Sequence, residues 1–448
     1  MEVCCAAQAY DDLNPKRSIA SEAGRGAGRG AEGARRARQL GARGCRRRAM
    51  APSLASLCRW PRSEPCTVAG LMTGTSCDAL DVAVLRFAPA AAGGAWTLVA
   101  HGSAPLSDGS SGSELGARLA TAGECSAHDA FALSFEYSAF VAEAVRGFLS
   151  KEGLLEAEVV DLVVSHGQTI GHAPAKGCGW TAQIGDGNAL AARLGLPVLW
   201  NLRSADVALG GQGAPLVPAA DALLFARPLD GVVLLNVGGV ANVTVLPPAE
   251  RGTPPEAEDA GPGNCLLDHW CHQAAGVDFD EGGLMGLAGS VDEERAKALA
   301  KACQPSVQGE SLDYRPPRRE ALIAAHVAGL SAADGCATLA RVTAALAADA
   351  VRRACERAKL VGSDAPRELL VAGGGAHNAA LLQRLQEEMG ELCTVRALGR
   401  GNSDIPPDAR EAACFAALGW LWLHGESGAV QGVTGASREA MLGSLALP

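Results

Sequence analysis

The stretch GLMTGTSCDALDVAVLRF, residues 70–87, decides the fold class. Its apolar ends predict two strands, and the turn between them carries glycine, hydroxyl groups and the carboxylates Asp78 and Asp81. Glycine lets a backbone approach a polyphosphate closely, hydroxyl and free N–H groups bind phosphate oxygens, and an acid can hold Mg²⁺. This stretch alone leaves one alternative open, a β-hairpin with an ordinary polar turn.

The composition is that of a globular protein with an acidic body. The 448 residues, 48% hydrophobic and 20% charged, predict two or three domains. Residues 1–65 contain 13 Lys and Arg against 6 Asp and Glu, so this segment has a net charge of +7 and the remainder −17. An acidic body argues against nucleic acid as a partner. An anion such as ATP must then be bound through Mg²⁺ and backbone dipoles.

Cysteine usage and the N-terminal segment bear on location. The 15 cysteines include no CxxC pair, which is typical of reduced thiols in an intracellular protein and favours the cytoplasm. No apolar run reaches the ~18 residues of a membrane span, so no membrane partner is expected. The Arg-, Gly- and Ala-rich residues 1–65 predict a disordered leader. Organelle import, a spurious extension ahead of a start at Met50, and RNA binding are the alternative interpretations of this leader.

The opening pattern returns twice. Residues 230–248, DGVVLLNVGGVANVTVLPP, again predict strand, glycine turn and strand. Residues 367–389 predict a strand, the turn Gly373-Gly374-Gly375 and a helix starting near Asn378. A helix N-terminus behind a glycine turn offers N–H groups to a phosphate or a nucleoside. Neither GxxxxGK[ST] nor GxGxxG after a strand is present, which favours ATP over NAD on a Rossmann sheet.

Three glycine turns in this order resemble the actin-like ATPase and sugar-kinase fold. The resemblance implies an α/β protein with two lobes, each of which offers a hairpin to the phosphates of ATP in an interdomain cleft. We expect a first kinase domain of residues 66–212 plus about 425–448, and a second of residues 213–424.

Longer stretches are similar to those of the anhydro-N-acetylmuramic acid kinase family and follow the family's order. The resemblance implies an enzyme of peptidoglycan recycling that hydrolyses the bond of 1,6-anhydro-N-acetylmuramic acid and phosphorylates O6, giving N-acetylmuramic acid 6-phosphate. It also implies ATP, Mg²⁺ and a homodimer. The stretches are residues 70–84, SHGQTIGHAP (165–174), QIGDGNALA (183–191), GGQGAPLVPA (210–219), LNVGGVANVTVL (235–246), DAGPGNCLLDHW (259–270), AGGGAHNAALLQRL (372–385), PPDAREAACFAALGWL (406–421) and VTGA (433–436).

Asp259 is the candidate catalytic base. O6 of the anhydro ring has no proton to lose, so a base is needed for the water that attacks the anomeric carbon. The resemblance assigns this role to Asp259, which opens DAGPGN, where we expect a glycine-rich turn ahead of a helix. From the residues alone, a helix cap or an Asx turn is the alternative.

The resemblance also implies two sets of binding residues. Four of the candidate residues also have purely structural interpretations. These alternatives are a buried structural histidine for His166, a surface salt bridge for Arg203, a capping acid for Asp268 and a helix-terminal acid for Glu411. Arg203 is the candidate for the lactyl carboxylate of the sugar, and Asp78 for Mg²⁺. The nucleotide set is Gly74, Thr75, Ser76, Cys77, Asp78, Ala79, Leu80, Asp81, Gly238, Gly239, Asn242, Gly373, Gly374, Gly375 and Asn378, and the sugar set is Ser165, His166, Gln168, Thr169, Arg203 and Glu411.

The chain departs from the family at four places. Asn201 stands where DFR begins in the family, Gly171 where an Arg is usual, and Gly187 where a Pro is usual, while residues 302–317 lack a PKSTGRE-like run. These positions fall on the sugar side. The alternative functions are therefore a kinase of the same fold for another anhydrosugar or amino sugar, and a nucleotide-binding homologue without catalysis.

Overall fold

The computed structural model describes residues 64–74, 77–89, 95–106, 112–155, 159–174, 178–304, 312, 314, 317–399 and 405–448, without the side chains of 112–114. The predicted leader lies outside the described residues up to residue 63. Thr75 and Ser76 of the first glycine turn and most of the departure at 302–317 lie outside them as well.

Apolar runs early in the chain form a six-stranded sheet. Its strands are β1 (Cys66–Thr73), β2 (Ala79–Phe87), β3 (Trp96–Pro105), β4 (Leu162–Ser165), β7 (Val198–Trp200) and β13 (Ser444–Ala446). β1 and β2 form the hairpin that the opening stretch predicts, and β3 extends it to an antiparallel meander. On the other side of β1, β4 is parallel to β1 and β7 is parallel to β4, with β13 antiparallel at the edge.

A five-stranded sheet repeats this order. Its strands are β8 (Val232–Val237), β9 (Val240–Leu246), β10 (Glu256–Pro262), β11 (Glu368–Ala372) and β12 (Thr394–Ala397). β8, β9 and β10 form the second antiparallel meander, and β11 and β12 follow in parallel on the other side of β8. The sheet orders β3-β2-β1-β4-β7 and β10-β9-β8-β11-β12 are therefore equivalent. The duplicated unit is that of the predicted α/β actin-like ATPase and sugar-kinase fold.

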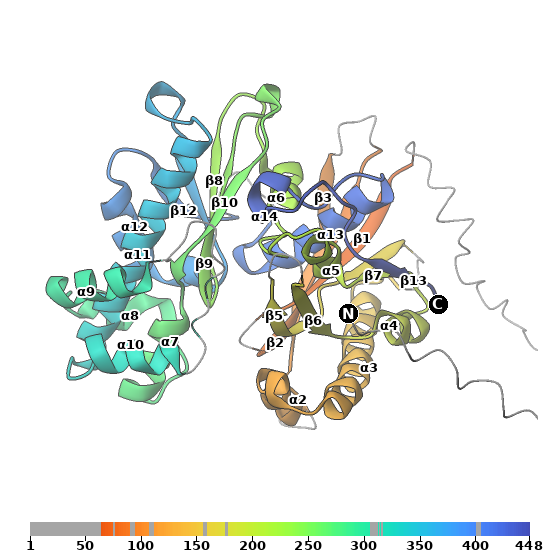
Figure 1. The fold of residues 1–448 in the computed structure, drawn as a ribbon, viewed down its shortest axis with the longest axis horizontal. Helices are drawn as coiled ribbons and strands as arrows, with labels where there is room; N and C mark the ends of the chain where they lie inside the picture. Colours follow the sequence, from red (N-terminus) through yellow and green to blue (C-terminus); the bar gives the residue numbers. More distant parts are fainter. Residues whose placement is uncertain are drawn as a thin grey trace, which may run out of the picture. The chain divides into compact units, whose positions relative to one another are not determined.

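Helices pack on both faces of the first sheet, because its strands are apolar on both faces (Figure 1). Along β1, Ala69 and Leu71 belong to the buried cluster that contains α3, whereas Val68 belongs to the cluster that contains α13. A Ser126 cap that accepts from the Asp129 N–H starts α3. The helices of this part are α2 (Gly112–Ala120), α3 (Ala127–Lys151), α4 (Gly187–Leu194), α5 (Leu202–Ala208), α6 (Pro218–Phe225), α13 (Arg410–Leu423) and α14 (Gln431–Thr434).

The second sheet is covered on one face by α11 and α12, which share a buried cluster with β8, β9 and β11. A separate cluster joins α7, α9 and α10 to α11. These helices are α7 (Cys265–Ala275), α8 (Leu284–Ala288), α9 (Glu293–Cys303), α10 (Arg318–His326), α11 (Ala332–Arg357) and α12 (Ala379–Met389). A small sheet of β5 (Gln168–Ala173) and β6 (Trp180–Ile184) follows β4 in the chain.

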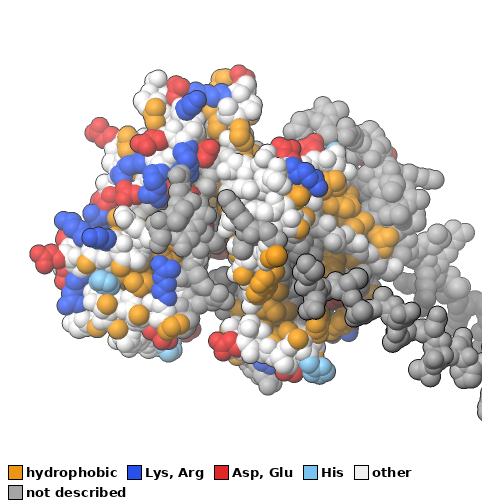
Figure 2. All heavy atoms as spheres, viewed as in Figure 1, with side chains coloured by type: hydrophobic (Ala, Val, Ile, Leu, Met, Phe, Trp, Pro, Cys, Tyr) orange, Lys and Arg blue, Asp and Glu red, His pale blue; other side chains and the backbone are white. Residues whose placement is uncertain are grey.

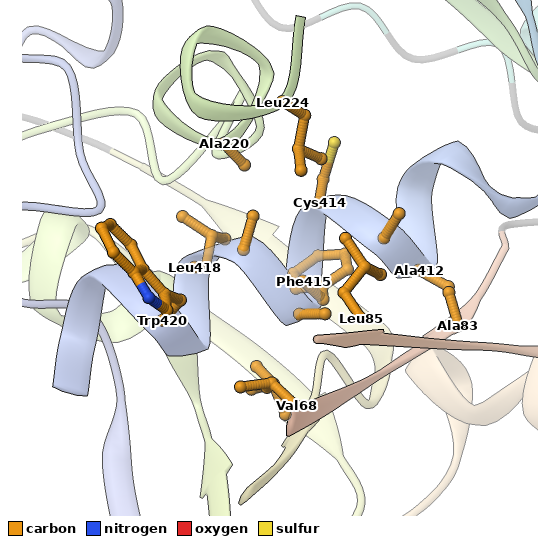
Figure 3. Packing of buried hydrophobic residues seen from close by; sticks show 14 of the residues in the cluster. Val68, Ala83, Leu85, Ala220, Leu224, Ala412, Cys414, Phe415, Leu418 and Trp420 are labelled. Atoms are coloured by element: carbon orange, nitrogen blue, oxygen red, sulfur yellow. The ribbon is translucent and has the colours of Figure 1, made fainter. Parts of the chain in front are cut away.

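Helix α13 packs into a core that both large sheets share. Figure 3 shows Phe415 of α13 between Leu224 of α6 and Leu85 of β2, and the same buried cluster includes Leu234 of β8 and Leu370 of β11. At Gly70, a Cβ would lie 2.5 Å from the backbone nitrogen of Ala416, so glycine in β1 allows the helix to approach. The sequence-based boundary near residue 424 places α13 in the second domain, whereas the helix contacts β1, β2 and β4 of the first sheet. The division into domains stays a prediction.

Charges of both signs are interspersed on the face shown in Figure 2, with no wide field of one sign there. Within the described part of the chain, no helix is long and apolar enough to cross a membrane.

Candidate active site

The first glycine turn connects β1 to β2 and is held from below by a buried glutamine. Cys77 has a left-handed backbone (φ 54°) and donates its N–H to the Gly74 carbonyl at 3.2 Å. The Gln168 side chain is buried, and with its amide nitrogen turned to the loop it donates to the carbonyls of Thr73 and Gly74, both at 3.2 Å. Gln168, predicted to line the sugar pocket, therefore supports the nucleotide turn in this structure.

The second glycine turn lies against the DAGPGN segment. The carbonyl of Gly239 accepts from the Gly263 N–H at 3.0 Å, and that of Gly238 accepts from the Asn264 N–H at 2.7 Å. A Cβ on Gly263 would lie 2.2 Å from the Gly238 oxygen, so only glycine permits this approach. Among the described residues other than its chain neighbours, a Cβ on Gly238 would meet no atom closer than the Val240 carbonyl oxygen, at 3.8 Å. The Gly238 side of the turn is therefore open.

The third glycine turn lies next to the second. The Asn264 amide donates to the Val237 carbonyl at 3.1 Å, and a Cβ on Gly374 would lie 3.3 Å from that amide nitrogen. Gly373 has a left-handed backbone (φ 73°) and donates its N–H to the Pro407 carbonyl, 3.2 Å away, just before α13. Asn378, predicted to bind nucleotide, caps α12 by accepting from the Leu381 N–H at 2.9 Å.

Asp259 lies inside strand β10, in a row of polar side chains that crosses three strands. Asn242 of β9 is opposite both Asn236 of β8 and Asp259. Residues opposite one another on neighbouring strands project to the same face of a sheet. Leu234, two residues before Asn236, belongs to the shared core around α13, so the row faces the side of α13.

The prediction that Asp259 opens a turn ahead of a helix is wrong. β10 continues to Pro262 through a register shift between Asp259 and Gly261, where Gly261 has φ 153°. α7 begins only at Cys265, so Asp259 neither caps a helix nor closes an Asx turn. Glycine and proline normally interrupt strands, but here the bulge lets pairing with β9 continue.

Burial and neighbouring charges set the protonation of Asp259. Burial raises the pKa of Asp259 to about 6, opposed by the Leu312 N–H, which donates to Oδ2 at 2.9 Å, and by the Arg203 guanidinium. Burial lowers the pKa of Arg203 to about 10, with the carboxylates of Glu411 and Asp259 opposing it. Asp259 is therefore a base near neutral pH, with a cation in its electrostatic range.

Arg203 and His166 are fixed to each other. Arg203 donates from Nε to Nε2 of His166 at 2.9 Å and from Nη1 to the Gly213 carbonyl at 2.8 Å. His166 Nδ1 lies 2.8 Å from the Gly167 carbonyl, so the two contacts together require a neutral ring with its proton on Nδ1. Burial, then Arg203, lowers the pKa of His166 to about 3. Arg203 is thus held by neutral acceptors, and no salt bridge satisfies it within the described residues.

Glu411 at the start of α13 lies beside Asn236. The Asn236 amide donates to Glu411 Oε1 at 3.5 Å, and Asn236 Oδ1 is buried with no hydrogen-bond partner among the residues that the structure describes. Burial raises the pKa of Glu411, with Arg410 and then Arg203 opposing it. Arg410 itself forms a buried bidentate ion pair with Asp221 of α6, at 3.1 and 2.5 Å. This pair fixes the start of α13, and with it Glu411.

Further carboxyl groups gather around the first turn. Burial raises the pKa of Asp81 to about 6, and Asp78, Glu411 and Asp408 add to the rise, while a hydrogen bond with Ser103 opposes it. Burial raises the pKa of Asp268 to about 7, with Asp78 adding to it and Arg319 opposing it. Within the described residues, no three His, Cys, Asp or Glu side chains are grouped closely enough to hold a metal ion by themselves.

Some predicted residues contact the core instead of a ligand. Leu80 is buried in the core beside α3, so only its backbone can meet a nucleotide. Ser165 is buried at the end of β4, and Thr169 accepts from the Gln183 amide at 3.3 Å. The exposed Asp78 accepts from the Ala79 N–H through Oδ1 at 3.0 Å. Sequence reasoning missed Asn236 and Arg319, because their place depends on strand register and on a distant helix.

Three departures from the family pattern are matched by local packing. A Cβ on Gly171 would lie 2.5 Å from the Trp180 ring, and a Cβ on Gly187 would lie 2.2 Å from the Trp200 ring. Asn201 has a left-handed backbone (φ 55°), which asparagine tolerates well. Arg203 remains in place two residues later. These changes therefore accompany neighbouring tryptophans and a turn, and they leave the Arg203 contacts intact.

Sequence comparison decides the family. A family model described as anhydro-N-acetylmuramic acid kinase matches residues 66–448. The chain belongs to the anhydro-N-acetylmuramic acid kinase family. Relatives of that name are similar over most of their length. One from Synechococcus sp. (strain CC9605) is 36% identical over 397 residues, covering 84% of this chain and 97% of the relative.

Two further members of the anhydro-N-acetylmuramic acid kinase family are similar to the same extent. The protein of Shewanella woodyi is 35% identical over 382 residues, covering 84% of this chain and 97% of its own. That of Saccharophagus degradans is 34% identical over 394 residues, covering 86% of this chain and its own full length. As a member of the anhydro-N-acetylmuramic acid kinase family, the chain is a phosphotransferase that uses ATP.

Proposed function

We propose that this kinase hydrolyses the 1,6-anhydro bond of 1,6-anhydro-N-acetylmuramic acid and phosphorylates O6, giving N-acetylmuramic acid 6-phosphate in peptidoglycan recycling. The observation that supports this best is the placement of Asp259, a carboxyl with its pKa raised to about 6 that shares an electrostatic environment with Arg203. A base of that strength is largely ionised at pH 7 and still able to accept a proton from water.

The proposed reaction balances with one base. Asp259 takes a proton from the water whose oxygen forms a bond to the anomeric carbon. The bond between that carbon and O6 breaks, and its electron pair stays on O6. O6 forms a bond to the γ-phosphorus of ATP as ADP leaves. O6 therefore needs no proton from an acid, which agrees with the absence of a second carboxyl role in this scheme.

Arg203 is the proposed partner of the lactyl carboxylate. Within the described residues its Nη2 has no hydrogen-bond partner, because Nε and Nη1 contact His166 and Gly213. A planar guanidinium with a free edge suits a carboxylate. Three of the predicted sugar-binding residues are buried and would support the sugar pocket from behind without contacting the sugar. These are Ser165, His166 and Gln168.

The nucleotide is proposed to bind at the three glycine turns, with Mg²⁺ beside the first. The open side of Gly238 leaves space for phosphate. Burial raises the pKa of Asp81, and the neighbouring carboxylates that add to this rise are ones that a cation would neutralise. Asp78, exposed and close to that group, would hold the ion. Mg²⁺ supplies neutralisation of charge on the phosphates. A homodimer stays a prediction from the resemblance, and a cytoplasmic location stays a prediction from the cysteine usage.

The test is the reaction with 1,6-anhydro-N-acetylmuramic acid, ATP and Mg²⁺ in ¹⁸O-labelled water, analysed at once by mass spectrometry. We expect the 6-phosphate with one ¹⁸O on the anomeric carbon and none on the phosphate. A reaction without ATP is the control and should leave the ring closed. Phosphate carrying the label, or turnover of another amino sugar with none of this one, would contradict the proposal.

A further inference from the structure

A buried carboxylate next to Arg203 is used by no step of the proposed reaction. Asp206 lies three residues after Arg203 on α5 and is fully buried. Its Oδ1 accepts from the hydroxyl of Thr434 at 2.7 Å, and its Oδ2 accepts from the Gly213 N–H at 2.7 Å. Thr434 is also buried, on the short helix α14 near the C-terminus. α5 and α14 carry labels close together in Figure 1.

These contacts fix a loop whose carbonyl holds Arg203. The Gly211 N–H donates to the Asp206 carbonyl at 2.9 Å, and the Gln212 N–H donates to the Thr434 carbonyl at 2.8 Å. The loop ends at Gly213, which has a left-handed backbone (φ 65°) and accepts from Arg203 Nη1 at 2.8 Å. A Cβ on Gly211 would lie 2.2 Å from Asp206 Oδ2, so the loop is shaped around this carboxylate.

We infer that Asp206 and Thr434 are positioning residues that set the direction of the Arg203 guanidinium, and so the preference of the enzyme for a sugar that carries a carboxylate. The chain of contacts runs from Thr434 through Asp206 and Gly213 to Arg203. His166 fixes Nε of the same guanidinium, so Nη2 is left with one orientation. The inference rests on the proposed function, since it takes the lactyl carboxylate as the ligand of Arg203.

Thr434→Val is the main test, because valine keeps the shape of threonine and removes only the hydroxyl. The readout is kcat/KM for the anhydro sugar with its lactyl carboxylate against the same anhydro sugar without it. We expect the KM for the carboxylate-bearing sugar to rise about tenfold and the preference between the two sugars to fall by the same factor. The KM for ATP should stay unchanged. Thr434→Ser, which restores a hydroxyl, should restore the preference.

Two further variants separate positioning from general destabilisation. Thr338→Val removes a buried hydroxyl of α11 that also makes two hydrogen bonds, at 3.1 and 2.7 Å, away from these contacts, and should leave the preference unchanged. In an Arg203→Met background, Thr434→Val should have no further effect, since residues that act through one group are not additive. Asp206→Asn should be mild, because Asn can accept from Gly213 and donate to Thr434, whereas Asp206→Ala should lose the preference.

The outcomes distinguish this inference from the proposed function. A wild-type enzyme that phosphorylates neither sugar would refute the proposed function and this inference with it. A wild-type enzyme that prefers the carboxylate-bearing sugar, together with a Thr434→Val variant of unchanged preference, would refute the inference alone. The inference alone would also be refuted if Thr434→Val changed the preference between the two sugars equally in the wild-type and Arg203→Met backgrounds.

Discussion

At the scale of single residues, Asp259 shows how a strand sets the chemistry of a carboxyl group. Its backbone is fixed by pairing with Asn242, one oxygen accepts from the Leu312 N–H, and the Arg203 charge acts on it. Burial still outweighs these contacts, so the proton is held more tightly than in water. A rigid, moderately basic carboxylate next to a fixed cation can take a proton from a water molecule without rearrangement.

Asp259→Asn should abolish sugar phosphorylation while the fold and ATP affinity persist. The amide keeps the size of the side chain and removes its basicity, and loss of a general base costs about 10²–10⁴ in rate. Product formation by mass spectrometry and nucleotide binding by calorimetry measure the two parts. Turnover within about tenfold of wild type would refute the general-base assignment.

The pH dependence of activity and that of stability should run in opposite directions at Asp259. With a folded-state pKa of about 6, kcat/KM should fall about tenfold per pH unit below pH 6 and level off above it. Because the folded-state pKa lies above 3.8, the ordinary pKa of an Asp side chain, the folded protein binds an extra proton between these two pH values. The contribution of Asp259 to the free energy of unfolding therefore rises as the pH falls through 6, and it is constant below about pH 4.

Asp259→Asn is the matched variant for that linkage. It removes the cost of a buried charge, so its Tm should exceed that of the wild type at pH 8, and the difference should shrink towards pH 5. Thermal melts of both proteins at the two pH values measure this. A variant that is less stable than wild type at pH 8 would contradict this expectation. It would show that attraction between the Asp259 carboxylate and Arg203 stabilises the folded state by more than burial of the charge destabilises it.

At this scale, motif resemblance singles out Asp259 and Arg203 as candidate site residues, and their roles stay predictions. The partners of these side chains could not be predicted from the sequence. The contact of His166 with Arg203 joins residues 37 positions apart and depends on how α5 packs against β6, which no local pattern reveals. From the sequence, Gly171 is only a position where an arginine of the family is missing. In the structure the Trp180 ring occupies the space that a side chain at this position would need.

At the scale of elements, the contact between the second glycine turn and the DAGPGN segment involves two glycines with different physical demands. Gly263 is in close contact with the Gly238 carbonyl, whereas Gly238 itself faces open space. The first glycine is required by the fold, and the second is available to a ligand.

Gly263→Ala and Gly238→Ala should therefore have opposite effects. Gly263→Ala forces the DAGPGN segment away from the turn and should lower unfolding free energy by about 1–3 kcal/mol. Gly238→Ala should leave the unfolding free energy within about 1 kcal/mol of the wild-type value and raise the KM for ATP. Chemical denaturation and ATP titration separate the pair. A stable Gly263→Ala protein, or an unchanged KM in Gly238→Ala, would contradict this interpretation.

The Asp221–Arg410 pair between α6 and α13 should behave as a coupled unit. Both side chains are at most 1% exposed, and a third contact comes from the Cys414 thiol at 3.4 Å. Asp221→Ala leaves a buried cation and should cost about 3–5 kcal/mol, whereas Asp221→Leu with Arg410→Met should recover most of it. Urea unfolding of the single and double variants gives the coupling. Additive losses would show that the two charges do not depend on each other.

The elements themselves were largely predictable from periodicity and glycine turns. The hairpins at 70–87 and 230–248 and the strand, turn and helix at 367–389 form as expected. The DAGPGN segment was not, because glycine and proline indicate a turn, while pairing of Gly261 and Pro262 with β9 is a tertiary effect. Local propensity is a weak guide where a bulge continues a strand.

At the scale of the whole molecule, the repeat of sheet order was predictable, and the sharing of α13 was not. Each meander begins with a hairpin that two apolar runs in the sequence predict. The side on which α13 packs depends on Gly70 in β1, about 340 residues earlier, and on apolar contacts to both sheets. Sequence order suggests a domain boundary after α13, which stays a prediction, whereas the contacts of the helix with both sheets could not be predicted from the sequence.

The shared core around α13 has a consequence for how this protein can be divided. One apolar cluster contains Val68 and Leu85 of the first meander together with Leu234 and Leu370 of the second half. Neither half, expressed as a separate polypeptide, would keep its own share of that cluster covered, so the halves should be soluble only when produced together. The two sheets repeat one strand order, and the apolar cluster that they share predicts that both halves unfold together as a single cooperative unit.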